Sequence, residues 1–139
     1  MGKRRRVSQV RLLLDTHTFL YAINFWERLG SNARGALTDT QNERWVSAIT
    51  LAEIGIKVAI GKLPLPKDPD YYLRHLEALR AEILPVGAQH SLKLLKLLGL
   101  LLHHRGPFDR LLIAQAKTEG LTIVTQDRAF GAYGVATVW

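Results

Sequence analysis

Short apolar runs alternate along the chain with longer segments in which apolar residues recur every three or four positions. The short runs have the length and apolar character of buried strands, and they are Arg11–Asp15, Arg44–Ser47, Ile83–Val86, Leu121–Thr125 and Val135–Val138. The longer segments have the spacing of helices with one buried face, and they are Thr16–Leu29, Ala33–Thr38, Thr50–Ile60, Pro69–Arg80, Ala88–Leu98 and Phe108–Glu119.

This alternation predicts the fold class. Strands separated by helices are joined by right-handed crossovers, which make the strands parallel and cover both faces of the sheet. We therefore expect an α/β fold, a three-layer α/β/α domain with a central parallel sheet of about five strands. A chain of 139 residues suits one domain. We assign it to residues 11–139, with residues 1–10 as a basic N-terminal tail.

The composition narrows the classes of function. A net charge of +7 and a pI near 10.1 favour a polyanionic partner, nucleic acid first and an acidic protein or membrane surface second. The absence of cysteine excludes disulfides and thiolate metal sites and is typical of a cytoplasmic protein. The leucine-rich segment Leu92–Leu102 is interrupted by two lysines and a glycine. It is too short to span a bilayer, and no membrane span is expected.

Four acidic residues stand at corresponding places relative to the predicted strands. Asp15 ends the first strand, and Glu53 lies in the first turn of the helix after the second strand. Asp109 opens a helix, and Asp127 follows a strand. In a parallel sheet, the carboxyl ends of the strands and the starts of the following helices share one edge, where ligands bind. The four carboxylates should therefore face one region.

Each acidic residue also has a purely structural interpretation. Asp15 and Asp109 suit helix N-caps, Glu53 would complete a T-L-A-E capping box with Thr50, and Asp127 suits a turn. Four carboxylates brought together repel one another, however, and lose solvation. A hard cation such as Mg²⁺ or Mn²⁺, which favours oxygen ligands, removes that cost. Next to a basic surface, such a site is typical of phosphoryl chemistry.

Four segments together resemble the PIN-domain ribonucleases, and more narrowly the VapC-like toxins of type II toxin–antitoxin systems. They are RLLLDTH at 11–17, TLAEIGIK at 50–57, HRGPFDRLLIAQA at 104–116 and LTIVTQDRAF at 121–130. The resemblance covers nearly the whole chain from Arg11 to Trp139, and PFDRLLIAQA followed by LTIVTQD is its most specific part. Two positions depart from the family pattern: Gly106, where the family often has Asp, and Ala52, where it often has Trp.

The resemblance implies a Mg²⁺- or Mn²⁺-dependent endoribonuclease that hydrolyses phosphodiester bonds in RNA. The family's acidic positions, which bind the metal and carry catalysis, are occupied here by Asp15, Glu53, Asp109 and Asp127. Two threonines next to these residues would hydrogen-bond the ligand carboxylates, namely Thr16 and Thr125. The resemblance also implies a homodimer and a cognate antitoxin protein that inhibits the enzyme.

Other interpretations stay open at this point. Three arginines flank the acidic residues and would either hold phosphates or remain solvated, namely Arg105, Arg110 and Arg128. The histidines lack the i, i+4 spacing of a zinc pair, and neither an Asp-x-Asp motif after the first strand nor a phosphate-binding glycine loop is present. The main alternative is a non-catalytic PIN-fold module that binds RNA or a partner protein. A third possibility is DNA as the substrate.

Overall fold

A computed structural model of the protein describes residues 9–97 and 106–139. Its centre is a sheet of five strands in the order β3-β2-β1-β4-β5, with every neighbouring pair parallel. The strands are β1 Arg11–Leu14, β2 Glu43–Ser47, β3 Ala81–Leu84, β4 Thr122–Val124 and β5 Thr137–Val138. The predicted α/β class with a five-stranded parallel sheet is therefore confirmed.

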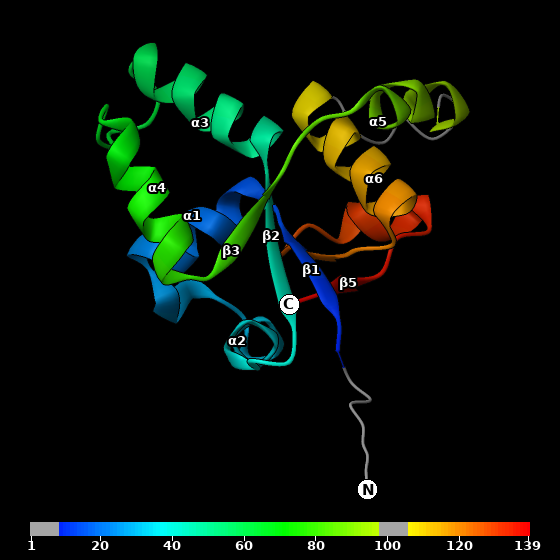
Figure 1. The fold of residues 1–139 in the computed structure, drawn as a ribbon, viewed down its shortest axis with the longest axis horizontal. Coiled ribbons are helices and arrows are strands. Elements are labelled where there is room, and N and C mark those ends of the chain that lie inside the picture. The colour runs from blue at the N-terminus through cyan, green and yellow to red at the C-terminus, as the bar shows by residue number, and fades with distance from the viewer. Residues whose placement is uncertain (1–8, 98–105) are drawn as a thin grey trace, which may run out of the picture.

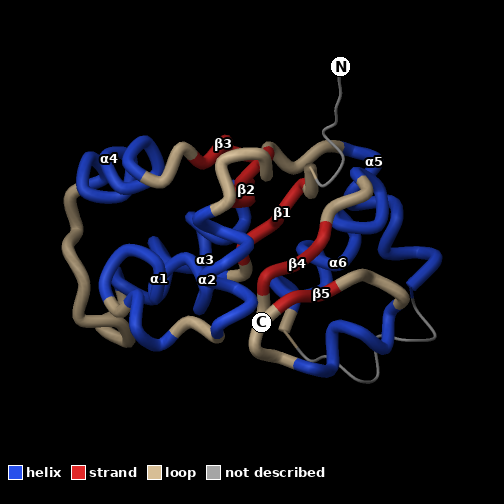
Figure 2. Tube along the Cα trace, turned by 90° about the horizontal axis from the view of Figure 1, so that it is seen from below, coloured by secondary structure: helices blue, strands red, loops and turns tan. Residues whose placement is uncertain are grey.

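Helices cover both faces of this sheet (Figure 1). They are α1 Thr16–Asn24, α2 Ser31–Thr38, α3 Ala48–Ala59, α4 Pro69–Ala78, α5 Ala88–Lys93 and α6 Pro107–Glu119, with 3-10 turns η1 Trp26–Arg28 and η3 Arg128–Tyr133. Figure 2 shows α1 to α4 on one side of the strands and α5 and α6 on the other. The three layers follow from this arrangement.

The alternation of side chains along β1 explains the two faces. Leu12 and Leu14 are buried in one cluster with residues of α1, α2, α3 and α4, whereas Leu13 is buried in a second cluster with α6 and η3. Successive side chains of a strand point to opposite faces, so a strand buried on both faces is apolar at every position. Full burial of each leucine contributes roughly 1.5–3 kcal/mol.

The strand order creates a switch point between β1 and β4. The chain builds outward from β1 through β2 to β3, and then returns to the other side of β1 with β4 and β5. Ligands of open parallel sheets bind outside the carboxyl ends of the strands at such a point. At this end of the sheet the first turns of α3 and α6 lie next to each other (Figure 1).

Several predicted boundaries differ from the structure, among them those of two helices and one strand. The helix predicted for Thr16–Leu29 ends at Asn24, because Phe25 leaves helical geometry and η1 then carries Leu29 back into the core. The strand predicted for Ile83–Val86 lies two residues earlier, since Pro85 cannot donate to a sheet ladder. The helix predicted for Ala88–Leu98 is α-helical only to Lys93 and continues as 3-10 over 94–97, while Leu98 lies outside the described residues.

The remaining strand boundaries are close to prediction. β4 and β5 are shorter than the predicted Leu121–Thr125 and Val135–Val138.

The basic run in residues 1–10 lies almost entirely outside the described residues. Within the described ranges, no helix is both long and apolar enough to cross a membrane.

Candidate metal and nucleic-acid site

The four predicted acidic residues line one cavity of about 340 Å³ at the carboxyl edge of the sheet. They come from four elements that are distant in the sequence: the end of β1, the helix α3, the first turn of α6 and the start of η3. The lining residues are Asp15, Thr16, His17, Glu53, Lys57, Gly106, Phe108, Asp109, Asp127 and Phe130. The convergence predicted from the sheet topology is therefore present.

Asp15 has two separate roles for its two carboxylate oxygens. Its Oδ1 accepts a hydrogen bond of 2.9 Å from the backbone N–H of Thr18, which caps α1. Its Oδ2 accepts a 2.6 Å hydrogen bond from the Thr125 hydroxyl. The residue is only 7% exposed, and a buried carboxylate with two good donors is held in one orientation. Capping and a place at the site coexist in this residue.

Glu53 does not occupy the position predicted for it. α3 begins at Ala48 with Ser47 as its N-cap, whose side chain accepts from the N–H of Ile49. Glu53 therefore lies in the second turn rather than the first, and the predicted capping box with Thr50 is wrong. The reason is that buried Ser47 caps the helix directly at the end of β2.

Both carboxylate oxygens of Glu53 are engaged by neighbouring side chains. Oε1 accepts a 2.6 Å hydrogen bond from the Thr16 hydroxyl, and Oε2 accepts one of 2.8 Å from the Lys57 ammonium. The Glu53 side chain is 12% exposed. Thr16 follows Asp15 directly, so this hydrogen bond connects the start of α1 to the middle of α3.

Asp109 and Asp127 both lie at the start of a helix, Asp109 in the first turn of α6 and Asp127 as the N-cap of η3. Asp109 is the third residue of α6, whose N-cap is Gly106, so the sequence placed it correctly in the first turn but wrongly as an N-cap. A carboxylate there still interacts favourably with the helix dipole. Asp127 caps η3 by accepting from Ala129 N–H, and its own N–H donates to the Thr125 hydroxyl.

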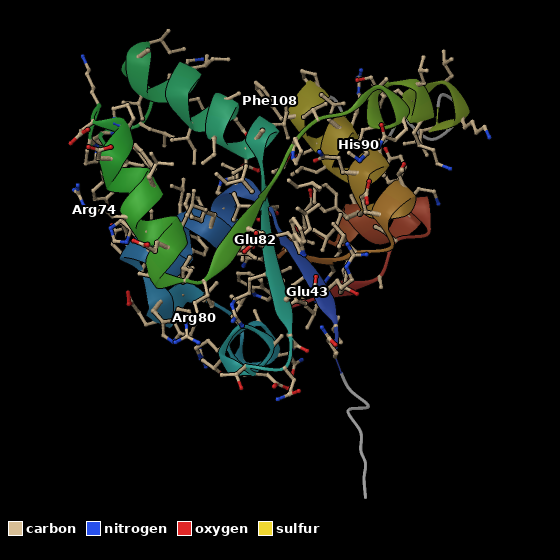
Figure 3. All side chains as sticks on the ribbon, in the orientation of Figure 1. Glu43, Arg74, Arg80, Glu82, His90 and Phe108 are labelled. Atoms are coloured by element: carbon tan, nitrogen blue, oxygen red, sulfur yellow. The ribbon has the colours of Figure 1, made fainter. Side chains whose placement is uncertain are left out.

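Two phenylalanines and His17 also line the cavity. Phe108 lies at the start of α6, where that helix is next to α3 (Figure 3). Phe130 is buried. Burial raises the pKa of Tyr133, the charge of Arg110 lowers this pKa and the charge of Asp109 raises it. His17 is exposed and lines the cavity.

Of the three predicted phosphate-binding arginines, the two that the structure describes do not line the cavity. Arg110 and Arg128 lie on α6 and η3 without lining the cavity, and Arg105 lies outside the described residues. The cation that does line it is Lys57, which the sequence analysis did not single out. The sequence spacing indicates this position of Lys57, because Lys57 follows Glu53 by four residues on a helix and the two side chains therefore share a face.

The chemistry of these donors fits a hard cation. Oxygen ligands from carboxylates are those that Mg²⁺ and Mn²⁺ favour, and Mg²⁺ typically keeps several waters while contacting one or two carboxylates. Over residues 9–97 and 106–139, no three acidic or histidine side chains are already close enough to hold a metal together.

A second, larger cavity lies beside the acidic one. It has a volume of about 470 Å³, and residues of α3 and α4 together with the loop between them form its walls. The lining is mostly apolar and includes Leu51, Ile54, Val58, Tyr72 and Leu73. This groove shares α3 with the acidic cavity: its wall residues Ile54 and Val58 directly follow Glu53 and Lys57 in the chain.

Comparison with known proteins assigns the family. The PIN domain profile matches residues 12–136, and the chain belongs to the PIN domain family. No curated protein matches the chain. The assignment agrees with the parallel sheet and with the acidic residues at its carboxyl edge.

Three solved structures illustrate the similarity of fold. FitAcB from Neisseria gonorrhoeae is 27% identical with a TM-score of 0.56, covering 91% of this chain and 95% of that one. VapBC2 from Rickettsia felis, bound to a DNA fragment from their promoter, is 22% identical with a TM-score of 0.66, covering 92% and 97%. VapBC-1 from nontypeable Haemophilus influenzae is 19% identical with a TM-score of 0.66, covering 92% and 96%.

Proposed function

We propose that this chain is a Mg²⁺- or Mn²⁺-dependent endoribonuclease and the toxin of a toxin–antitoxin pair. One observation carries the proposal: four carboxylates from four separate elements line one cavity at the switch point of a PIN-family sheet. Capping alone does not account for this convergence. Glu53 caps no helix, and Asp109 is not an N-cap.

The residues that would hold the cation are Asp15, Glu53, Asp109 and Asp127. When bound, Mg²⁺ or Mn²⁺ supplies positive charge that polarises a phosphodiester and stabilises the leaving oxygen. The protein's own contribution is to fix the carboxylates. The Thr125 hydroxyl orients Asp15, and the Thr16 hydroxyl orients Glu53. Such supporting hydrogen bonds set the direction of ligand oxygens.

The net charge favours a nucleic acid as the substrate, and the resemblance to the PIN-domain ribonucleases favours RNA. The chain carries a net charge of +7, which attracts a polyanion over the whole surface. Four of the twelve acidic residues line the cavity, where a bound cation would compensate their charge. A basic surface would thus bind the phosphate backbone while the acidic cavity carries the metal that acts on one phosphate.

A protein antitoxin is the partner supported by the comparisons. The similar structures named above are VapBC and FitAcB assemblies, and the apolar groove between α3 and α4 has the character of a surface that a protein segment covers. Because α3 lines both the groove and the acidic cavity, we expect a segment that binds the groove and extends past α3 to restrict access to the cavity. A homodimer remains part of the proposal.

The proposal is tested by incubating the protein with total cellular RNA in Mg²⁺ or Mn²⁺, and in EDTA. The variant Asp109→Asn removes one carboxylate, and Asp70→Asn is its matched control. Asp70 lies in the first turn of α4, which begins with proline as α6 does, but it does not line the cavity. We expect metal-dependent fragments from the wild type and from Asp70→Asn, and none from Asp109→Asn.

A folded wild type that produces no fragments in either metal would contradict the nuclease. It would favour the alternative, a PIN-fold module that binds RNA or protein without cleaving. Expression in a bacterial host tests the toxin: growth should stop with the wild type and continue with Asp109→Asn. Growth that stops equally with both variants would separate toxicity from the acidic site.

A further inference from the structure

Lys57 brings a positive charge into a cavity that is otherwise acidic. Its Nζ lies 2.8 Å from Oε2 of Glu53, one helical turn earlier on α3. Of the ten lining residues in the described part of the chain, four are carboxylates and Lys57 is the one permanent cation. An ion pair of this spacing on an open helix surface contributes little. This pair differs because it lines the cavity and its carboxylate is largely buried.

Each carboxylate oxygen of Glu53 already accepts a hydrogen bond from a protein side chain. Thr16 occupies Oε1, and Lys57 occupies Oε2. A cation that approaches Glu53 therefore competes with a side chain that is itself a cation. The Thr16 hydroxyl is neutral and comes from a buried residue, whereas the Lys57 side chain is 40% exposed on a flexible four-carbon stem. Lys57 is the partner that can move.

We propose that Lys57 is an exchangeable counter-ion and a phosphate-binding residue. In the absence of metal its ammonium neutralises Glu53. With a cation and RNA bound at the site, Lys57 would release Glu53 and its ammonium would contact the substrate phosphate. Lysine serves as such a point-charge contact to phosphate in other proteins. This inference rests on the proposed function, because it assigns a contact to the same substrate at the same site.

The two roles predict effects of opposite sign when the charge is removed. Without Lys57, Glu53 has no internal competitor, and the repulsion between the ammonium and an incoming divalent cation disappears. Metal affinity in the absence of RNA should therefore increase. The phosphate contact is lost at the same time, so RNA cleavage should slow. A residue that merely held Glu53 in place would make both quantities fall.

The experiment compares Lys57→Met, which keeps the apolar stem, with Lys57→Arg, which keeps the charge. Lys62→Met is the control, since Lys62 is exposed just beyond the end of α3 and does not line the cavity. Mn²⁺ affinity is measured without RNA by calorimetric titration. The ratio kcat/KM is measured with single-stranded RNA at saturating Mn²⁺. Thermal unfolding in EDTA establishes that each variant is folded.

We expect Lys57→Met to bind Mn²⁺ about tenfold more tightly than the wild type and to show a kcat/KM lower by about tenfold or more. Lys57→Arg should retain most of the activity, and Lys62→Met should match the wild type in both measurements. Weaker Mn²⁺ binding by Lys57→Met overturns the counter-ion role. Unchanged cleavage by Lys57→Met overturns the phosphate contact.

The failure of this inference is distinguishable from failure of the proposed function. An active wild type with an unaffected Lys57→Met variant overturns the assignment of Lys57 alone and leaves the nuclease standing. A folded wild type that cleaves no RNA overturns the proposed function, and the phosphate contact with it.

Discussion

The hydroxyl of Thr125 donates a 2.6 Å hydrogen bond to Asp15, across 110 positions of the sequence. This bond joins the ends of β4 and β1, the two strands that flank the switch point of the sheet. The same hydroxyl accepts a hydrogen bond from the backbone N–H of Asp127. One threonine thus contacts two of the four acidic residues that line the cavity, and it fixes their relative positions.

Replacing Thr125 with valine keeps the shape of the side chain and removes this hydroxyl. Asp15 then loses a donor while it stays buried, and loss of such a partner costs roughly 1–3 kcal/mol of the free energy of unfolding. We expect that loss in urea unfolding, together with lower RNA cleavage because Asp15 is no longer oriented. Thr125→Ser keeps the hydroxyl and should restore most of both. A valine variant as stable and active as the wild type would show that the bond is incidental.

Binding of Mn²⁺ should stabilise the folded protein. A ligand that binds only the folded form at a hundred times its dissociation constant adds roughly 2.7 kcal/mol to the free energy of unfolding. We expect the thermal midpoint to rise with Mn²⁺ for the wild type and for Asp70→Asn, and to rise much less for Asp109→Asn. Equal shifts for all three proteins would place the metal outside the cavity.

A close contact between Gly30 and the last residue of the described chain gives a prediction about stability. A Cβ at Gly30 would lie 2.5 Å from the backbone oxygen of Trp139, and that oxygen accepts a hydrogen bond from Ala33 N–H. Gly30→Ala should therefore cost about 1–3 kcal/mol, as overpacking does.

The control for Gly30→Ala is Gly35→Ala. Gly35 is inside α2 with open space around it. Alanine there should stabilise the helix by about 0.5–1 kcal/mol. Chemical denaturation of both variants should thus give changes of opposite sign. Changes of the same sign would contradict the contact with Trp139.

Glu43 gives a prediction for the dependence of stability on pH. The hydrogen bond from the Trp45 indole lowers the pKa of Glu43, burial opposes this, and Arg11 adds to the lowering. A carboxyl group with a lowered pKa stabilises the folded state above its unfolded pKa, and this contribution is lost as the pH falls through the folded pKa. The free energy of unfolding of Glu43→Gln should therefore fall below that of the wild type at pH 7 and approach it at pH 3. A difference that stays constant over this range would contradict the pKa shift.

The elements of the fold were predictable from the sequence because each has a local cause. Apolar runs such as LLL in β1 are buried on both faces of the sheet, and the helices have clear apolar faces. The errors also have local causes. Pro85 ends β3 earlier than its apolar residues indicate, and Phe25 ends α1 although the helical spacing continues to Leu29.

The convergence of the four acidic residues was predictable from the sequence, but which side chain contacts each carboxylate, including the contact of Lys57 with Glu53, was not. Parallel topology brings the four acidic residues to one edge of the sheet whatever their rotamers are. The position of Glu53 in the second turn depended on Ser47 rather than Thr50 capping α3, and both residues suit a cap equally well. The contact of Lys57 with Glu53 depends on the direction of the lysine side chain. The sequence spacing alone does not determine whether that side chain points to the solvent, the core or the cavity.

The shared role of the four carboxylates is tested by the cleavage rate of one defined RNA substrate by four single variants in Mn²⁺. They are Asp15→Asn, Glu53→Gln, Asp109→Asn and Asp127→Asn, each beside Asp70→Asn and each checked for folding. Loss of a hydrogen-bonding partner of a metal ligand typically costs about 10–100-fold in activity. We therefore expect the cleavage rate of each of these four variants to fall at least about a hundredfold, while Asp70→Asn keeps the wild-type rate. A folded variant among the four that cleaves at the wild-type rate would contradict the claim that these carboxylates form one site.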